Sequence, residues 1–124
     1  MELTKKTLKE FCTYLKQVKY KGIVQEVKME YNMDDNSKEV FIHLNTIKIK
    51  TRMRNQGYGS KVLNDIIEFA DSHNVRIQLY ASGIFGSTVD RLYGFYERQG
   101  FTRIADDKDG LMVRPKKSEM IYCT

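Results

Sequence analysis

A short basic segment with two glycines leads directly into an amphipathic helix, and this arrangement could bind an anion. Residues 52–70 read RMRNQGYGSKVLNDIIEFA. Glycine inside a helix costs about 1 kcal/mol relative to alanine, so Gly57 and Gly59 need a reason to be there. The first amides of a helix point outward as unpaired donors, and the helix dipole adds positive charge beside them. A bare backbone would let a phosphate reach those amides.

The glycine spacing does not by itself establish a phosphate site. GYGSK lacks the first glycine of a P-loop at the required distance, and the third glycine of the dinucleotide-binding fingerprint is also missing. Arg52, Arg54 and Lys61 would supply positive charge around a bound anion. The alternative is that the glycines only ease the turn from a strand into a helix.

The elements before the glycine segment follow from the spacing of apolar residues. This spacing predicts a helix over residues 4–19, with Thr7 and Glu10 as a capping box. Alternating residues predict strands over 23–32 and 39–49. The polar turn between these strands indicates an antiparallel hairpin.

After the glycine segment, the pattern predicts two helices, a strand and a second hairpin. The first helix stops near Asn74 and buries Val62, Leu63, Ile66, Ile67 and Ala70. A central strand over 75–81, a helix capped by Ser87 or Thr88, and a hairpin of residues 101–105 and 111–114 follow. Residues 115–124 would be a frayed end or an edge strand. The order α-β-β-α-β-α-β-β predicts an α/β or α+β fold with a mixed sheet.

Composition indicates one globular domain, residues 1–124, in a reducing cytoplasm. Apolar residues make up 41% of the 124 residues, and neither a signal peptide nor a membrane-spanning apolar run is found. Cys12 and Cys123 lack disulfide or metal-ligand spacing. The net charge of +5 favours a nucleic acid, a phosphorylated cofactor or an acidic substrate, although a basic solvated surface is the alternative.

Two motifs together carry a resemblance to a known family. Residues 54–59, RNQGYG, and 91–101, RLYGFYERQGF, resemble the GNAT acetyltransferase superfamily. Its cofactor signature is Q/R-x-x-G-x-G/A between a strand and an amphipathic helix, and its second signature is an aromatic–Tyr pair followed by x-x-x-Gly-Phe. The resemblance covers residues 39–114 and implies a mixed, mostly antiparallel sheet flanked by helices. It also implies direct acetyl transfer from acetyl-coenzyme A (acetyl-CoA) to an amine, without a metal.

The resemblance assigns coenzyme binding to two stretches of the chain. Main-chain groups of Ile47, Lys48 and Ile49 would hold the pantetheine arm like an added strand. Arg54 would be the charged partner of the pyrophosphate, which the backbone amides of the glycine segment would surround. That segment comprises Arg54, Asn55, Gln56, Gly57, Tyr58, Gly59 and Ser60. Arg91 is a further candidate contact for the coenzyme phosphates.

The same resemblance implies catalytic roles. Tyr96 would protonate the leaving thiolate, which is reasonable because phenols and thiols have comparable proton affinities. A backbone N–H near Ile49 would stabilise the oxyanion. For the base that deprotonates the incoming ammonium, His43 is our candidate, with Glu39 behind it on the same strand face. A tyrosine that only packs in the core and a histidine that only packs in a strand are the alternatives.

Two features depart from the family pattern. Val89 and Asp90 stand where many members carry an asparagine that contacts the cofactor. Only one helix and one strand precede residue 39, whereas the family usually has an extra strand and helix that commonly form the acceptor pocket. The site is therefore expected to be open, or completed by a second subunit of a homodimer.

The function that these motifs indicate is an N-acetyltransferase. Its acceptor would be a small amine, a protein amine or an aminoacyl-tRNA, and the basic surface favours the last two. The alternative is a catalytically inactive module of the same fold that binds protein or nucleic acid.

Overall fold

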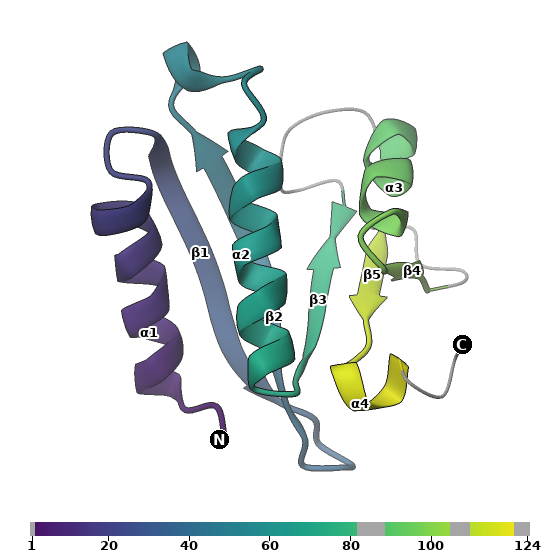
Figure 1. The fold of residues 1–124 in the computed structure, drawn as a ribbon. Coiled ribbons are helices and arrows are strands. Elements are labelled where there is room, and N and C mark those ends of the chain that lie inside the picture. The colour runs from purple at the N-terminus through teal and green to yellow at the C-terminus, as the bar shows by residue number, and fades with distance from the viewer. Residues whose placement is uncertain (1, 82–88, 105–109, 121–124) are drawn as a thin grey trace.

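Five strands form one sheet in the computed structural model, which describes residues 2–81, 89–104 and 110–120. The spatial order is β1-β2-β3-β5-β4 (Figure 1). The strands are β1 (Val24–Met33), β2 (Val40–Ile49), β3 (Arg76–Tyr80), β4 (Thr102–Arg103) and β5 (Leu111–Arg114). Only β2 and β3 run parallel, and the other neighbours are antiparallel. The sheet is thus mixed and mostly antiparallel, as the sequence predicted.

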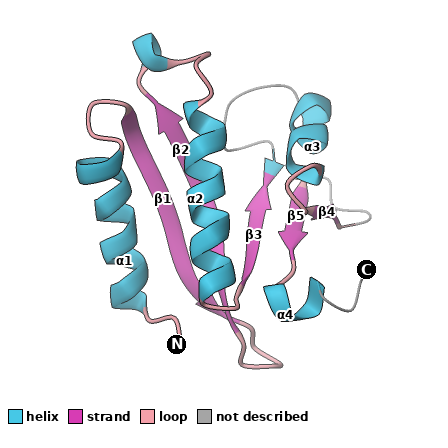
Figure 2. Cartoon of the chain, viewed as in Figure 1, coloured by secondary structure: helices cyan, strands magenta, loops and turns pink. Residues whose placement is uncertain are grey.

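Helices connect and cover these strands. They are α1 (Lys5–Tyr14), which continues into the π-helical turn η1 (Leu15–Lys19), α2 (Tyr58–Ser72), α3 (Val89–Glu97) and the short α4 (Lys117–Met120). A 3-10 turn, η2 (Thr51–Met53), lies between β2 and α2. Figure 2 shows α2 in front of β2, with β3 on one side of it and β1 and then α1 on the other. Among the described residues, no helix combines the length and apolar character that a membrane crossing requires.

The core lies between the sheet and these helices. Ile42 and Leu44 of β2 are fully buried, and so are Ile77 and Leu79 of β3. The five residues predicted for the apolar face of α2 are all buried, which confirms that helix and its orientation. The rings of Phe11 and Phe69 stack at 4.0 Å between centroids, so α1 and α2 pack against each other on this face of the sheet.

The first helix starts earlier than the predicted capping box would place it. Thr4 is the N-cap, and its hydroxyl accepts a hydrogen bond from the Thr7 N–H at 3.1 Å. Thr7 lies inside the helix, so the capping box of Thr7 and Glu10 is wrong. Leu3 and Leu8, both buried, occupy the two positions of a hydrophobic staple around Thr4, which explains why the chain enters the helix there.

The remaining boundaries match the sequence closely, with one further correction. Asn74 adopts a left-handed conformation, with φ of 52°, directly after α2 and so ends it as predicted. The tail forms α4, where the sequence analysis expected a frayed end or an edge strand. The predicted N-caps Ser87 and Thr88 and the end of the tail at 121–124 lie outside the described residues.

Asp34 organises the turn of the first hairpin. Its carboxylate accepts hydrogen bonds from the backbone N–H groups of Ser37 and Asn36, at 3.0 and 2.9 Å, which hold the pKa of Asp34 below its usual value. Beyond the turn the strands pair residue by residue from Met33↔Val40 to Met29↔Leu44. The turn therefore sets the cross-strand register of the hairpin.

One ion pair connects the far edge of the sheet to α2. The Arg114 guanidinium is buried, donates to Asp71 Oδ1 at 2.7 Å, and also donates to the Gln99 carbonyl at 3.0 Å. We expect Asp71→Asn to lower the free energy of unfolding by about 2 kcal/mol, because it leaves a buried cation poorly compensated. Urea denaturation would measure this change.

The matched control is Glu97→Gln. The Glu97 carboxylate lies 3.8 Å from Arg103, and both side chains are about half exposed. Its loss should change stability by less than about 0.5 kcal/mol. Equal effects of the two substitutions would contradict the importance given to the Arg114 contact.

Candidate functional site

The parallel strands β2 and β3 pair only over the first half of β2. Their pairing runs from Phe41↔Arg76 to Leu44↔Leu79 and stops there. β2 continues to Ile49, paired with β1 alone. Figure 1 shows the end of β2 leading away from β3. On its β3 side, the backbone of residues 45–49 thus has no strand partner within the described parts of the chain.

A β-bulge accompanies this separation. Lys28 pairs with Thr46 and Met29 with Leu44, so Asn45 is an extra residue in β2. A bulge bends its strand and increases the local twist. The buried positions accordingly change from Ile42 and Leu44 before the bulge to Ile47 and Ile49 after it.

The first turn of α2 begins beyond the end of β2, across a short loop. Gly57 is the N-cap, with φ of 81° and ψ of 8°, and no side chain caps the helix. A Cβ at Gly57 would meet nothing within 4 Å, so glycine is needed there for its left-handed backbone. Gly59 already lies in the helix, in a conformation open to any residue. The two glycines therefore have different explanations, and the turn-easing alternative accounts for Gly57 only.

Arg54 links the loop to the strand. Its Nε donates to the Ile49 carbonyl at 3.1 Å, although the side chain is largely exposed. Lys61 Nζ lies 5.1 Å from the centroid of the Tyr58 ring, on the first turn of α2. The structure thus connects the two stretches predicted to bind the coenzyme, residues 47–49 and 54–60. Arg91 belongs to α3, but its side chain lies outside the described part of the structure.

Tyr96 lies within the hydrophobic core on α3. Its side chain has no exposed surface, and its ring packs edge-on against Phe95 and Phe101, with centroids 5.2 and 5.7 Å away. Burial raises the pKa of the Tyr96 phenol, because it penalises the phenolate. The hydroxyl is thus neutral at physiological pH and able to donate a hydrogen bond.

The structure does not bring Glu39 to His43. Glu39 precedes β2, and four residues of extended chain, about 13 Å, separate the two positions. The Glu39 carboxylate pairs with Lys116 Nζ at 2.6 Å, and this contact raises the pKa of Lys116.

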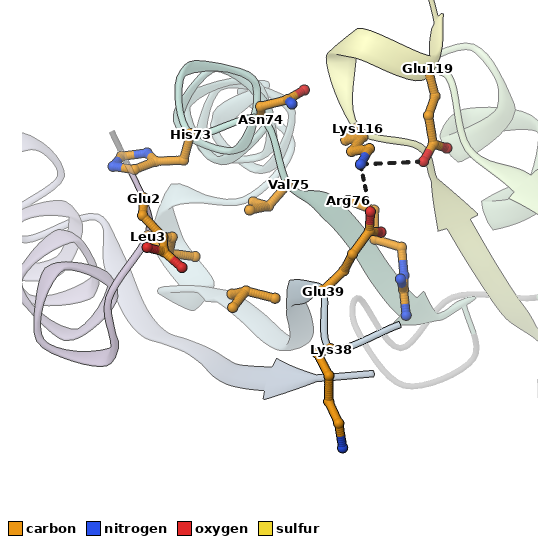
Figure 3. A pocket seen from close by; sticks show the side chains of 11 residues that line it. Glu2, Leu3, Lys38, Glu39, His73, Asn74, Val75, Arg76, Lys116 and Glu119 are labelled. Carbon is orange, nitrogen blue, oxygen red and sulfur yellow. Dashed lines mark hydrogen bonds and ion pairs between the residues drawn. The ribbon is translucent and has the colours of Figure 1, made fainter. Parts of the chain in front are cut away.

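Glu39 instead lines a cavity of about 210 Å³ where β2 and β3 begin, shown in Figure 3. Lys116 lies between Glu39 and Glu119 there, and Arg76 lies 3.4 Å from Asp34. Much of the charge at this cavity is thus compensated within the chain, at the end of the sheet opposite the α2 N-terminus.

Three residues near His43 were assigned no role by the sequence analysis. Glu30 faces His43 across the β1–β2 ladder, and Asn45 Nδ2 donates to Glu30 Oε1. The Tyr80 ring lies edge-on to the His43 ring, with centroids 5.5 Å apart. The turn predicted at residues 34–37 was no usable signal for Glu30, since counting back equally from it places Glu30 opposite Phe41, two residues from its observed partner His43.

The family model for the Acetyltransferase (GNAT) family matches residues 10–101. The chain therefore belongs to the GNAT acetyltransferase family, which confirms the resemblance seen in its two motifs. No curated protein matches the sequence.

Solved structures show the same fold. AtaTR bound with AcCoA is similar with a TM-score of 0.56 and 14% identity, over 79% of this chain and 61% of that one. The KacTA–DNA complex has a TM-score of 0.55 and 16% identity, and the match covers 93% of this chain and 85% of that one. A mutant AtaT toxin bound to the C-terminus of the antitoxin AtaR and acetyl-CoA has a TM-score of 0.53 and 13% identity, and the match covers 80% of this chain and 64% of that one. This chain thus spans about three fifths of the AtaTR chain.

The protonation of Tyr96 can be tested by titrating phenolate absorbance. Because its pKa is higher in the folded than in the unfolded chain, ionisation opposes folding, and the stabilising contribution of the neutral phenol declines above about pH 10. In the folded chain at about pH 10.5, Tyr96→Phe should leave the absorbance unchanged. After denaturation at the same pH, the substitution should lower the phenolate absorbance by the contribution of one of the eight tyrosines. Loss of that share already in the folded chain would show that Tyr96 ionises normally.

Proposed function

We propose that this chain is an N-acetyltransferase that uses acetyl-CoA as co-substrate and transfers the acetyl group directly to an amine. The observation that carries this proposal is the junction of β2 and α2. There, an uncapped helix N-terminus adjoins a strand whose backbone is open toward β3, in a chain of the GNAT family. The similar structures of AtaTR and AtaT contain acetyl-CoA, which supports the choice of co-substrate.

The residues at this junction fit a bound coenzyme. The N–H groups at the start of α2, from Tyr58 to Ser60, receive no side-chain cap and can donate to a pyrophosphate. Arg54 and Lys61 add positive charge beside them. The open backbone of residues 45–49 can pair with the amide groups of a pantetheine arm as an added strand would. Gly59 would keep a side chain away from the phosphates.

Three groups of the chain would act on the reacting atoms. The thioester of acetyl-CoA supplies an activated acetyl group when the coenzyme is bound. A backbone N–H near Ile49 would donate to the developing oxyanion. The Tyr96 hydroxyl, held neutral by burial, would donate a proton to the leaving sulfur. His43 would accept the proton of the incoming ammonium, directly or through water.

The acceptor is a small amine, a protein amine or an aminoacyl-tRNA. The net charge of +5 favours the two macromolecular acceptors, because it would steer an acidic partner to the surface. A homodimer could complete the acceptor side. The second candidate function is an inactive binding module of the same fold, which the complete burial of Tyr96 in the core favours.

Calorimetry of acetyl-CoA binding to the native chain and to Gly59→Glu tests the proposal. The glutamate would put bulk and negative charge against the phosphates at the start of α2, so we expect affinity to fall by at least about 100-fold. Asn64→Glu is the control, because Asn64 is exposed on the same helix, beyond its first turn. It should bind acetyl-CoA within about twofold of the native chain.

Absence of acetyl-CoA binding by the folded native chain would contradict the enzyme proposal. Salt-sensitive binding of RNA or DNA in that case would support the inactive module. Equal binding by the native chain and Gly59→Glu would place the coenzyme elsewhere.

A further inference from the structure

A group of polar and aromatic side chains lies on the face of the sheet opposite α1 and α2. Ile42 and Leu44 point into the core beneath α2, so His43 between them points the other way. The ladder pairs place Glu30 of β1 and Gln78 of β3 on either side of His43. Asn45 and Tyr80 extend the group, as their contacts with Glu30 and His43 show. We refer to Glu30, His43, Asn45 and Tyr80 as the amine cluster.

The amine cluster is open to solvent and carries an uncompensated negative charge. Tyr80 is 38% exposed, Glu30 is exposed, and His43 and Asn45 are partly buried. Among the described residues, no lysine or arginine lies within 4 Å of the Glu30 carboxylate, which accepts a hydrogen bond from the side-chain amide of Asn45. The nearest cation along its strand is Lys28, two residues away on the same face. The Glu30 carboxylate and the Tyr80 ring lie on either side of His43, and a carboxylate and an aromatic ring suit a cation better than an anion.

The position of the amine cluster relates it to the proposed coenzyme site. His43 lies one residue before the end of the β2–β3 pairing, and Asn45 is the bulged residue where the strands separate. The pyrophosphate is proposed at the start of α2, beyond the other end of this open stretch. The pantetheine arm would run along residues 45–49, so its thioester end would lie near the amine cluster.

We propose that the amine cluster binds the primary alkylammonium group of the acceptor. Glu30 supplies the counter-charge, Tyr80 offers its ring face to the cation and its alkyl chain, and Asn45 holds the Glu30 carboxylate in place. This inference rests on the proposed acetyltransferase function and identifies where its acceptor enters, on the sheet face opposite the helices.

The reaction that follows is balanced within the proposed site. The ammonium gives one proton to His43, and the nitrogen lone pair forms a bond to the acetyl carbonyl carbon. The carbon–sulfur bond then breaks, sulfur leaves with the bonding pair, and Tyr96 supplies its proton. The nitrogen gives its second proton to the resulting Tyr96 phenolate, directly or through water, which restores the phenol and leaves a neutral amide, and His43 releases its proton to solvent. Glu30 takes no part in bond making and acts as a binding residue for the ammonium.

Binding of n-butylammonium chloride to the full chain without coenzyme tests this inference. At constant ionic strength, amide and side-chain NMR shifts should change saturably at residues 30, 43, 45 and 80. The uncharged analogue n-butanol should leave them unchanged. Glu30→Gln should weaken binding about fivefold, because it removes the charge but keeps an acceptor for Asn45. Tyr80→Leu should weaken it about threefold through loss of the ring.

Glu26→Gln is the matched control. Glu26 is exposed on β1 and on the same face, but its ladder partner is Lys48. Its substitution should leave the affinity for n-butylammonium within about 1.5-fold of that of the native chain. No saturable shift at the amine cluster, or equal weakening by Glu26→Gln and Glu30→Gln, would overturn the inference. Because the titration contains no coenzyme, its result is independent of whether acetyl-CoA binds.

Discussion

The bulge at Asn45 is the constraint from which the rest of the proposed site follows. One extra residue in β2 changes which of its side chains enter the core, from Ile42 and Leu44 to Ile47 and Ile49. The strand bends at the same place where its pairing with β3 ends. Beyond this pairing β3 has one more residue, Tyr80, whereas β2 continues to Ile49. The β3 side of the bent strand is therefore open beside the first turn of α2.

The hydrogen-bonding capacity of that region is what a coenzyme would use. The open edge of β2 and the uncapped start of α2 both offer backbone groups that have no partner in the secondary structure, and such groups can pair with a ligand. Gly57 enables the arrangement because its left-handed backbone directs the chain from the loop into α2. Gly59 has no such conformational reason, and this contrast is the structural argument for a ligand at the helix N-terminus.

Local patterns predicted most elements of the fold, because each depends on residues close in sequence. The apolar face of α2, the stop at Asn74 and the first hairpin all followed from periodicity and turn chemistry. The N-cap could not be chosen in this way, because Thr4 and Thr7 are both suitable caps, and burial of Leu3 and Leu8 decides between them. The contact of Glu39 with Lys116, 77 residues later, depends on how the sheet closes and has no local signal.

The candidate site was predictable to a similar degree. The motif at residues 54–59 predicted the α2 N-terminus, since its residues are close in sequence, and together with residues 91–101 it carried the resemblance to the family. Predicting that Glu30 faces His43 requires the register of β1 against β2, which the pattern of a single strand does not define. In the sequence, the bulge is marked only by a change in the alternation of apolar residues within HLNTIKI. A single change of this kind does not predict a bulge unless the pairing with the neighbouring strand is known.

Hydrogen exchange of the backbone amides, measured by NMR with and without acetyl-CoA, tests the central claim most directly. The claim is that the open stretch of β2 and the first turn of α2 together hold the coenzyme through their main chain. Binding should slow exchange at the amides of residues 45–49 that do not pair with β1, and at those of residues 58–60. Binding seen by calorimetry with unchanged exchange at both stretches would contradict the account.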